Sequence, residues 1–174
     1  MTDHVPITRL FDLSDLSDAG YATTITASQA ELARLAEWEG VLSVNLFEAH
    51  VILQRLSQTR FLYQGKLTAE LTQSCVVTLE PVQSGICREF SRELHYSPVR
   101  YPEKGGVLSL AAAEDEATEE IESLKFDLAG PLLEELSLAI DPYPRAAGVA
   151  FEPPEEPSDA AESPFAVLKR LKRG

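Results

Sequence analysis

Residues 61–72 read Phe-Leu-Tyr-Gln-Gly-Lys-Leu-Thr-Ala-Glu-Leu-Thr, and apolar side chains occupy nearly every second position of this stretch. A period of two places them on one face of an extended chain, which is typical of a strand with one buried face. Gly65 lies on the apolar face and predicts either a close approach by a neighbouring group or a bulge. The stretch therefore predicts a strand against a hydrophobic core, with these inward residues: Phe61, Tyr63, Leu67, Ala69 and Leu71.

The segments on either side of this strand also have strand character. Over residues 41–46 apolar and polar side chains alternate, whereas the irregular pattern at Glu48–Leu53 predicts a bulge or a twist. After the strand at residues 61–72, Cys75–Leu79 is expected to continue in an extended conformation, and Pro81 is expected to end it.

Residues 82–96 fit two structures. Ile86, Phe90 and Leu94 are four residues apart, which suits a helix, but together with Tyr96 they also share one face of a strand. The other strand face would carry Cys87, Glu89, Ser91, Glu93 and His95. A strand is favoured, because an antiparallel meander then links three consecutive extended segments through short connections.

Two helices are predicted from their end signals. Ser28 and Glu31 have the spacing of a capping box, and Gly40 suits the left-handed residue that ends a helix. A second helix is expected to begin near Pro131 and to end at Asp141–Pro142. A short strand is expected between these helices, near residues 121–126.

Together these elements predict an α+β fold. A twisted, mainly antiparallel sheet would form from the segments near 41–56, 60–80 and 82–97, packed by two main helices near 28–39 and 130–140.

Composition divides the chain into three parts. Residues 1–150 are expected to form a single α+β domain, from which an acidic loop at 101–120 projects as a mobile excursion. Residues 151–163 have the composition of a mobile linker, since residues 152–162 contain five acids, three prolines and no base. Residues 164–174 form a basic amphipathic C-terminal segment.

The charge balance limits the kinds of partner. With 15 Lys and Arg against 28 Asp and Glu, the chain has a formal net charge of -13, which disfavours broad wrapping of nucleic acid. Such a surface would attract a strongly basic partner, although simple solubility also explains the acidic composition.

No signal peptide precedes the first predicted elements, and the apolar run Val107–Ala113 is too short to span a bilayer. A cytoplasmic location without membrane contact is expected.

Signals for catalysis or metal binding are weak. Cys75 and Cys87 are twelve residues apart and form no ligand pair with His4, His50 or His95, so neither a metal nor another cofactor is predicted. His50 or His95 could approach a cysteine across the sheet, but no local motif supports a cysteine nucleophile. The chain also has no glycine-rich phosphate loop and no nucleophile elbow, so we predict that it is not an enzyme.

The C-terminal segment offers a candidate binding element. Its apolar residues Phe165, Leu168 and Leu171 fall three apart, and residues 163–174 carry four bases and no acid. It could fold back onto the domain. Alternatively, it could act as a tethered recognition segment, in which the apolar residues bind a groove of the partner and the bases bind phosphates or acidic side chains. In the second case the binding residues would be Phe165, Leu168, Lys169, Arg170, Lys172 and Arg173.

Three stretches, Cys75–Val82, Leu136–Arg145 and Pro164–Leu168, resemble the signature blocks of the YceD family of large ribosomal RNA subunit accumulation proteins. Several members carry a second cysteine three residues after the first, a pair that could bind metal, whereas this chain has Thr78. The resemblance therefore brings no zinc site to this chain. It marks the following motif residues, which we expect to be structural: Cys75, Thr78, Glu80, Pro81, Asp141, Pro142 and Pro144.

The resemblance implies a role in the synthesis, processing or stability of 23S rRNA, without an established enzymatic activity. We expect a factor that binds a large-subunit ribosomal protein or a pre-ribosomal particle, with possible rRNA contact through the C-terminal segment. The alternative is an RNA-processing enzyme that acts directly on precursor rRNA. A third hypothesis is a structural adaptor outside the ribosome.

Overall fold

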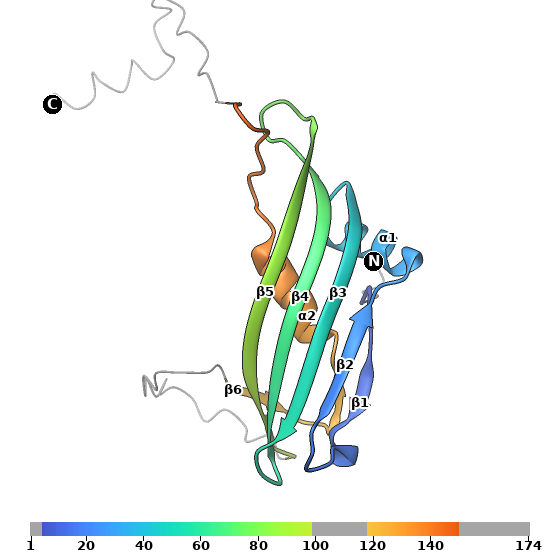
Figure 1. Ribbon diagram of the computed structural model, residues 1–174, viewed down its shortest axis with the longest axis vertical. Helices are drawn as coiled ribbons and strands as arrows, with labels where there is room; N and C mark the ends of the chain where they lie inside the picture. Colours follow the sequence, from blue (N-terminus) through green and yellow to red (C-terminus); the bar gives the residue numbers. More distant parts are fainter. Residues whose placement is uncertain (1–4, 99–117, 150–174) are drawn as a thin grey trace, which may run out of the picture.

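The computed structural model describes residues 5–98 and 118–149. A five-stranded sheet in the order β2–β3–β4–β5–β6 lies beside a two-stranded sheet of β1 and β7 and two α-helices (Figure 1). This arrangement confirms the predicted α+β class. The elements are β1 (Leu10–Asp12), the short 3-10 helix η1 (Leu13–Asp15), β2 (Tyr21–Thr26), α1 (Gln29–Glu39), β3 (Ser43–Arg55), β4 (Arg60–Ser74), β5 (Pro81–Tyr96), β6 (Thr118–Ile121), β7 (Lys125–Asp127) and α2 (Gly130–Ala139).

The central strand is β4, which pairs with β3 on one side and β5 on the other. Strands β2 to β5 form an antiparallel meander, and β6 adds to β5 in parallel. The inward residues predicted for β4 are all buried, each with at most 1% of its surface exposed. The strand at residues 82–96 is also confirmed, because β5 pairs with β4 from Ser74 opposite Pro81 to Arg60 opposite His95.

A bulge lies near the start of β3, earlier than predicted. The register with β4 shifts between Val44 and Leu46, so the buried positions move from Val44 to Phe47 and the odd-numbered residues after it. The expected irregularity at Glu48–Leu53 is wrong, since these residues pair without a break with both neighbours. The pattern looked broken there because the bulge had already exchanged the two faces of the strand.

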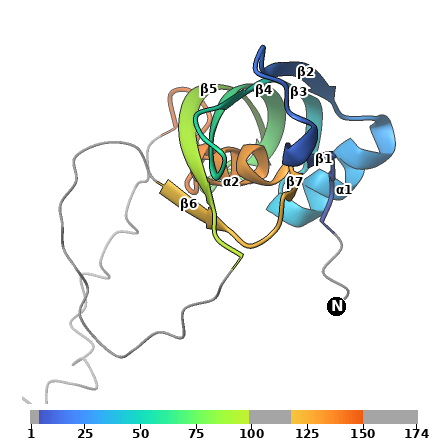
Figure 2. The same ribbon diagram turned by 90° about the horizontal axis from the view of Figure 1, so that it is seen from below.

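The two main helices begin and end close to the predicted positions. In α1 the Ser28 hydroxyl accepts from the Glu31 N–H and the Glu31 carboxylate accepts from the Ser28 N–H, while Gly40 ends the helix with φ 67°. In α2, Pro131 stands in the first turn. The sheet curves around α2, which packs on β4 and β5, while α1 packs on β3 (Figure 2).

The small β1–β7 sheet completes the core, although the sequence analysis did not predict it. The single strand expected at residues 121–126 is instead two strands, β6 and β7, which belong to different sheets. Strands of three or four residues are too short to display a period, so only pairing in the tertiary structure defines them. The edge strand β2 was also missed.

Tyr63 of β4 joins the large sheet to the segment between β7 and α2. Its side chain is fully buried, and its hydroxyl donates a 2.8 Å hydrogen bond to the Leu128 carbonyl. Burial raises the pKa of Tyr63 above its ordinary value, so the phenol remains a donor. The rings of Phe90 and Phe126 lie 5.7 and 6.1 Å from the Tyr63 ring.

Gly65 faces the same part of the core and creates the space for Phe90. A Cβ atom at position 65 would lie 2.6 Å from the Phe90 ring and 3.2 Å from the Tyr63 ring. The predicted close approach is therefore confirmed, and the chain pairs through Gly65 without a bulge.

Arg92 of β5 connects the sheet to α2. Its guanidinium lies 2.5 Å from the Glu134 carboxylate and 3.0 Å from that of Glu135, and only 16% of the side chain is exposed. Burial lowers the pKa of Arg92, but the bonds to the two carboxylates outweigh this and raise it overall. The guanidinium also lies over the Phe90 ring, 5.4 Å from its centroid.

Several predicted features lie outside the described residues. These are most of the acidic loop, the linker at 151–163 and the C-terminal segment at 164–174. Within residues 5–98 and 118–149, no helix combines the length and the apolar character needed to cross a membrane.

Replacing Gly65 by Ala is expected to lower the free energy of unfolding by about 1–3 kcal/mol, because the added methyl group overpacks the core against Phe90. Gly85→Ala makes the same chemical change where no atom lies within 4 Å, and should leave stability nearly unchanged. Urea unfolding of both variants checks this. Equal midpoints would show that Phe90 moves aside without cost.

Arg92→Met should reduce stability by about 1–2 kcal/mol, since it removes charge-assisted hydrogen bonds and leaves carboxylates grouped at the partly buried α2–β5 contact. Lys66→Met on the exposed sheet face removes the Lys66–Glu89 pair and should have no measurable effect. Thermal unfolding compares the two. Similar losses would contradict a special role for the Arg92 contact.

Candidate partner-binding site

The turn between β4 and β5 spans Cys75–Glu80, at the upper end of the sheet in Figure 1. The Leu79 N–H donates to the Cys75 carbonyl at 2.9 Å, and the Cys75 N–H donates to the Glu80 carbonyl at 2.8 Å. The prediction that Cys75–Leu79 is extended is therefore wrong, and Pro81 begins β5 instead of ending a strand. Val-Val-Thr favours a strand locally, but the antiparallel pairing of β4 with β5 requires the chain to reverse here.

The Cys75 sulfur accepts a hydrogen bond from the backbone N–H three residues later, as the side chain at the start of a helix does. It is buried, and it accepts hydrogen bonds from the N–H groups of Thr78 at 3.5 Å and Ala146 at 3.4 Å. Hydrogen bonding from the Thr78 side chain and from the backbone of Ala146, Thr78 and Val77 lowers the pKa of the Cys75 thiol to about 6. These hydrogen bonds favour the thiolate form over the thiol.

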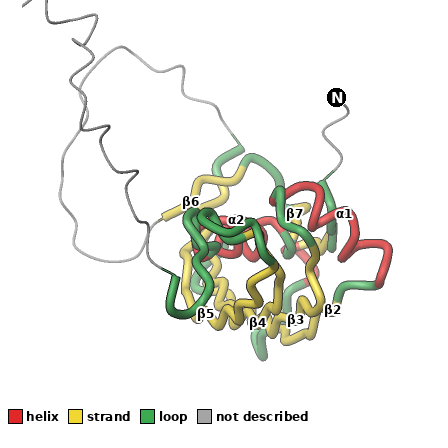
Figure 3. Tube along the Cα trace, turned by 90° about the horizontal axis from the view of Figure 1, so that it is seen from above, coloured by secondary structure: helices red, strands yellow, loops and turns green. Residues whose placement is uncertain are grey.

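The segment after α2 is attached to this turn and to the end of β4 by three hydrogen bonds. The Gln73 amide donates to the Asp141 carbonyl at 2.8 Å, and the Val76 N–H donates to the Pro144 carbonyl at 2.9 Å. The third bond is the one from Ala146 to the Cys75 sulfur. The two segments consequently lie side by side at one end of the molecule, the end nearest the viewer in Figure 3.

Exposed apolar side chains gather on these two segments. Val76, Val77, Leu79 and Tyr143 have 46%, 36%, 77% and 71% of their surfaces exposed, and we call these four residues the apolar tip. Leu79 has φ 63°, which is a conformation that costs a branched side chain about 1–2 kcal/mol. The fold thus holds a leucine in a strained backbone conformation and leaves its side chain in solvent.

The structure brings the first two motif blocks together. Cys75 and Pro144 are buried, and the Glu80 carbonyl and the Thr78 N–H both belong to the hydrogen-bonded turn. Asp141 is exposed and its carboxylate accepts from the Tyr143 N–H, while Pro142 and Pro81 are exposed at the end of α2 and the start of β5. Val77, which lies between Cys75 and Thr78 in the first block, has 36% of its surface exposed.

The predicted C-terminal binding residues Phe165, Leu168, Lys169, Arg170, Lys172 and Arg173 lie outside the described residues. The apolar tip was not predicted from the sequence. A signal was present, because Val76, Val77 and Leu79 interrupt the alternation that a half-buried strand would show.

The two described histidines, His50 and His95, do not lie beside the cysteines in the sheet. His95 pairs with Arg60 at the opposite end of β4 from Cys75, and His50 bonds to Thr24 at 2.9 Å. Cys87 is exposed opposite Thr68. Among the described residues, no group of three or more His, Cys, Asp and Glu could hold a metal ion.

The low pKa of Cys75 can be measured directly. In a Cys87→Ser variant, which retains Cys75 alone, thiolate ultraviolet absorbance should titrate with a midpoint near pH 6. Because the folded pKa lies below the ordinary value of 9.0, ionisation stabilises the fold above pH 9, and this contribution is lost as pH falls through 6. The free energy of unfolding should therefore rise from pH 6 to pH 9.

The matched control is Cys75→Ser, which should show neither the absorbance change near pH 6 nor the rise in stability relative to Cys87→Ser. A titration midpoint near pH 9 in Cys87→Ser would contradict the hydrogen-bonded thiolate.

Comparison with known proteins agrees with these motif blocks. The family model described as "Large ribosomal RNA subunit accumulation protein YceD" matches residues 63–172, which include most of β4, the apolar tip and all three blocks. No curated protein and no solved structure matches the chain. The chain belongs to the YceD family of large ribosomal RNA subunit accumulation proteins.

Proposed function

We propose that this protein is a non-catalytic factor in large ribosomal subunit biogenesis, which supports the synthesis, processing or stability of 23S rRNA by binding a ribosomal protein or a precursor particle. Membership of the YceD family supports the ribosomal context. We also propose that it acts in the cytoplasm, with residues 1–150 as one folded body.

The apolar tip is the main structural support for a binding role. Leu79 is 77% exposed and stands at φ 63°, so neither core packing nor turn formation explains a leucine at this position. Large apolar side chains grouped on a rigid, hydrogen-bonded turn are typical of a protein-binding surface. The buried Cys75 sulfur and the segment Asp141–Ala146 hold this surface in place.

The charge of the folded part favours a basic protein as the direct partner. The described residues contain nine Lys and Arg against 18 Asp and Glu, a net charge of −9. A surface of this sign repels rRNA phosphates but attracts a small basic ribosomal protein. The apolar tip would then supply contact area, and the acidic surface would accelerate and orient association.

The C-terminal segment supplies the opposite charge. The last described residue is Val149, three residues after Ala146, whose N–H bonds to the Cys75 sulfur. The linker at 151–163 follows it in the sequence. Thirteen residues span at most about 45 Å. We propose that Phe165 and Leu168, with the four bases that follow, contact the precursor particle or its RNA within this distance.

Direct processing of RNA by this chain has less support. The strongest nucleophile on chemical grounds is Cys75, but its sulfur is buried and already accepts structural hydrogen bonds. A nucleophile needs access and a neighbouring base, and the described histidines lie elsewhere.

Leu79→Asn should separate binding from stability. Asparagine tolerates the left-handed conformation, so the free energy of unfolding should increase by about 1 kcal/mol. Loss of the apolar side chain should nevertheless weaken binding by about tenfold. The measurement is recovery of large-subunit ribosomal protein and precursor rRNA after crosslinking in cells, with identification of both.

Leu56→Asn is the matched control, since Leu56 is 50% exposed in the turn at the other end of β4. It should retain full recovery. Neutralising Lys169, Arg170, Lys172 and Arg173 with serine should reduce crosslinked RNA more than crosslinked protein. Recovery of no ribosomal protein, no precursor rRNA and no assembly factor by the unaltered chain would overturn the proposal.

A further inference from the structure

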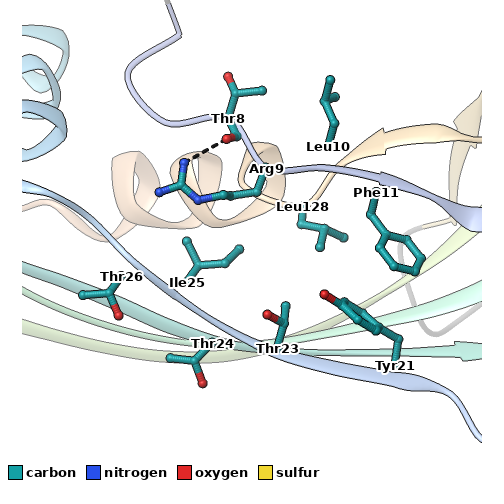
Figure 4. A pocket seen from close by; sticks show the side chains of 10 residues that line it. All are labelled: Thr8, Arg9, Leu10, Phe11, Tyr21, Thr23, Thr24, Ile25, Thr26 and Leu128. Atoms are coloured by element: carbon teal, nitrogen blue, oxygen red, sulfur yellow. Dashed lines mark hydrogen bonds between the residues drawn. The ribbon is translucent and has the colours of Figure 1, made fainter.

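An open groove of about 570 Å³ lies between β1 and β2, away from the β4–β5 turn (Figure 4). One wall is formed by residues 8–11 and the other by β2, with Leu128 at the base. Phe11 and Tyr21 stack at 4.3 Å between ring centroids and close one end of the groove. The chain therefore presents two neighbouring strands that are separated by a space instead of being paired.

The register shows which backbone groups of β2 face this space. The Ala27 N–H donates to the carbonyl of Phe47, which lies directly opposite it when the β2–β3 register is continued. Hydrogen-bonded pairs recur at every second residue of an antiparallel ladder. Ile25 and Thr23 therefore bond to β3, whereas Thr24 and its even-numbered neighbours direct their N–H and carbonyl groups away from it.

β1 also directs the backbone groups of alternate residues away from its partner strand. The Leu128 N–H donates to the Arg9 carbonyl and the Leu13 N–H donates to the Leu124 carbonyl, so Leu10 directs its backbone groups away from β7. β2 is the terminal strand of its sheet. Within the described part of the chain, no backbone hydrogen bond from another strand satisfies its outer edge.

The sequence of β2 leaves this edge unprotected. Tyr21–Thr26 contains no charged residue and no proline, although these are the usual means by which an edge strand is kept from pairing with other chains. The other terminal strand, β6, carries Glu119 and Glu120. An unpaired, uncharged edge beside a groove is the geometry used for strand addition by an extended peptide.

The net charge of the described residues, −9, favours a basic occupant. The one charged residue that lines the groove is Arg9. The segment from the end of β1 to the start of β2 carries Asp12, Asp15 and Asp18, where Lys125 lies opposite Asp12 and Arg55 donates to the carbonyls of Leu13, Ser14 and Leu16. Arg9 lies 2.8 Å from Glu31, and its side-chain hydrogen bond lowers the pKa of Glu31 to about 2, so this guanidinium already has a partner. A second copy of the chain is disfavoured as occupant, because two bodies of net charge −9 repel each other.

We propose that the β1–β2 groove binds an extended, lysine- or arginine-rich peptide segment, which adds to β2 as a further strand. Its backbone pairs with Thr24 and the other even-numbered residues of β2, and the net negative charge of the described residues attracts its basic side chains. This interaction surface is separate from the apolar tip and does not depend on the ribosomal role.

The test uses the full chain and a synthetic peptide of about eight residues that alternates lysine with valine. Binding should weaken at high salt, and the Thr24 N–H should exchange more slowly with solvent when the peptide is present. Thr24→Pro should weaken binding by about tenfold, because it removes an outward N–H without removing a bond to β3. Thr24→Val keeps this N–H and should bind normally.

A second measurement does not depend on how the proline variant folds. The same peptide with alternate backbone amides N-methylated should bind the unaltered chain at least about tenfold more weakly, and a glutamate–valine peptide should not bind. Equal binding of the methylated peptide, no binding of the lysine–valine peptide, or self-association through Thr24 without peptide binding would each overturn the proposal. Crosslinking through the apolar tip would be unaffected by these outcomes.

Discussion

The bond between the Tyr63 hydroxyl and the Leu128 carbonyl ties the centre of the large sheet to the connection between β7 and α2. A buried phenol must find an acceptor, and a buried carbonyl must find a donor, so each group constrains where the other segment can lie. Gly65, two residues along the same face, leaves room for the Phe90 ring beside Tyr63. The position of α2 within the curved sheet follows from these contacts, and the position of α2 in turn fixes where the chain reaches the β4–β5 turn.

At that turn, hydrogen bonds to a single sulfur join segments that are 71 residues apart in the chain. The Thr78 N–H donates to the Cys75 sulfur from within the turn, and the Ala146 N–H donates to it from the segment after α2. Here the sulfur is thus held by N–H donors from both segments. This arrangement links the turn to the segment after α2 and gives the apolar tip a defined shape, while it also buries the sulfur away from solvent. A structural cysteine and an exposed apolar surface are two consequences of the same set of bonds.

Two surfaces of different chemistry are available on the folded part of the chain. The apolar tip offers side chains for contact, whereas the edge of β2 offers backbone hydrogen bonds and an acidic setting. A basic ribosomal protein with an extended arm could use both surfaces at once, because they lie on different parts of the sheet (Figure 1). In that case the acidic body would neutralise the partner, and the positively charged C-terminal segment would remain for RNA.

The sequence alone determined the features that depend on local periodicity and end signals. The alternation around Gly65 predicted β4, and the pair Ser28 and Glu31 predicted the start of α1, because both patterns extend over enough residues to be distinctive. The three stretches that resemble the YceD family could also be recognised from the sequence. Tertiary structure decided what short or non-local segments do: it paired β1 with β7, reversed the chain at Cys75 despite its strand propensity, and left β2 with an open edge. These features depend on contacts between residues far apart in the chain, and no local pattern encodes such contacts.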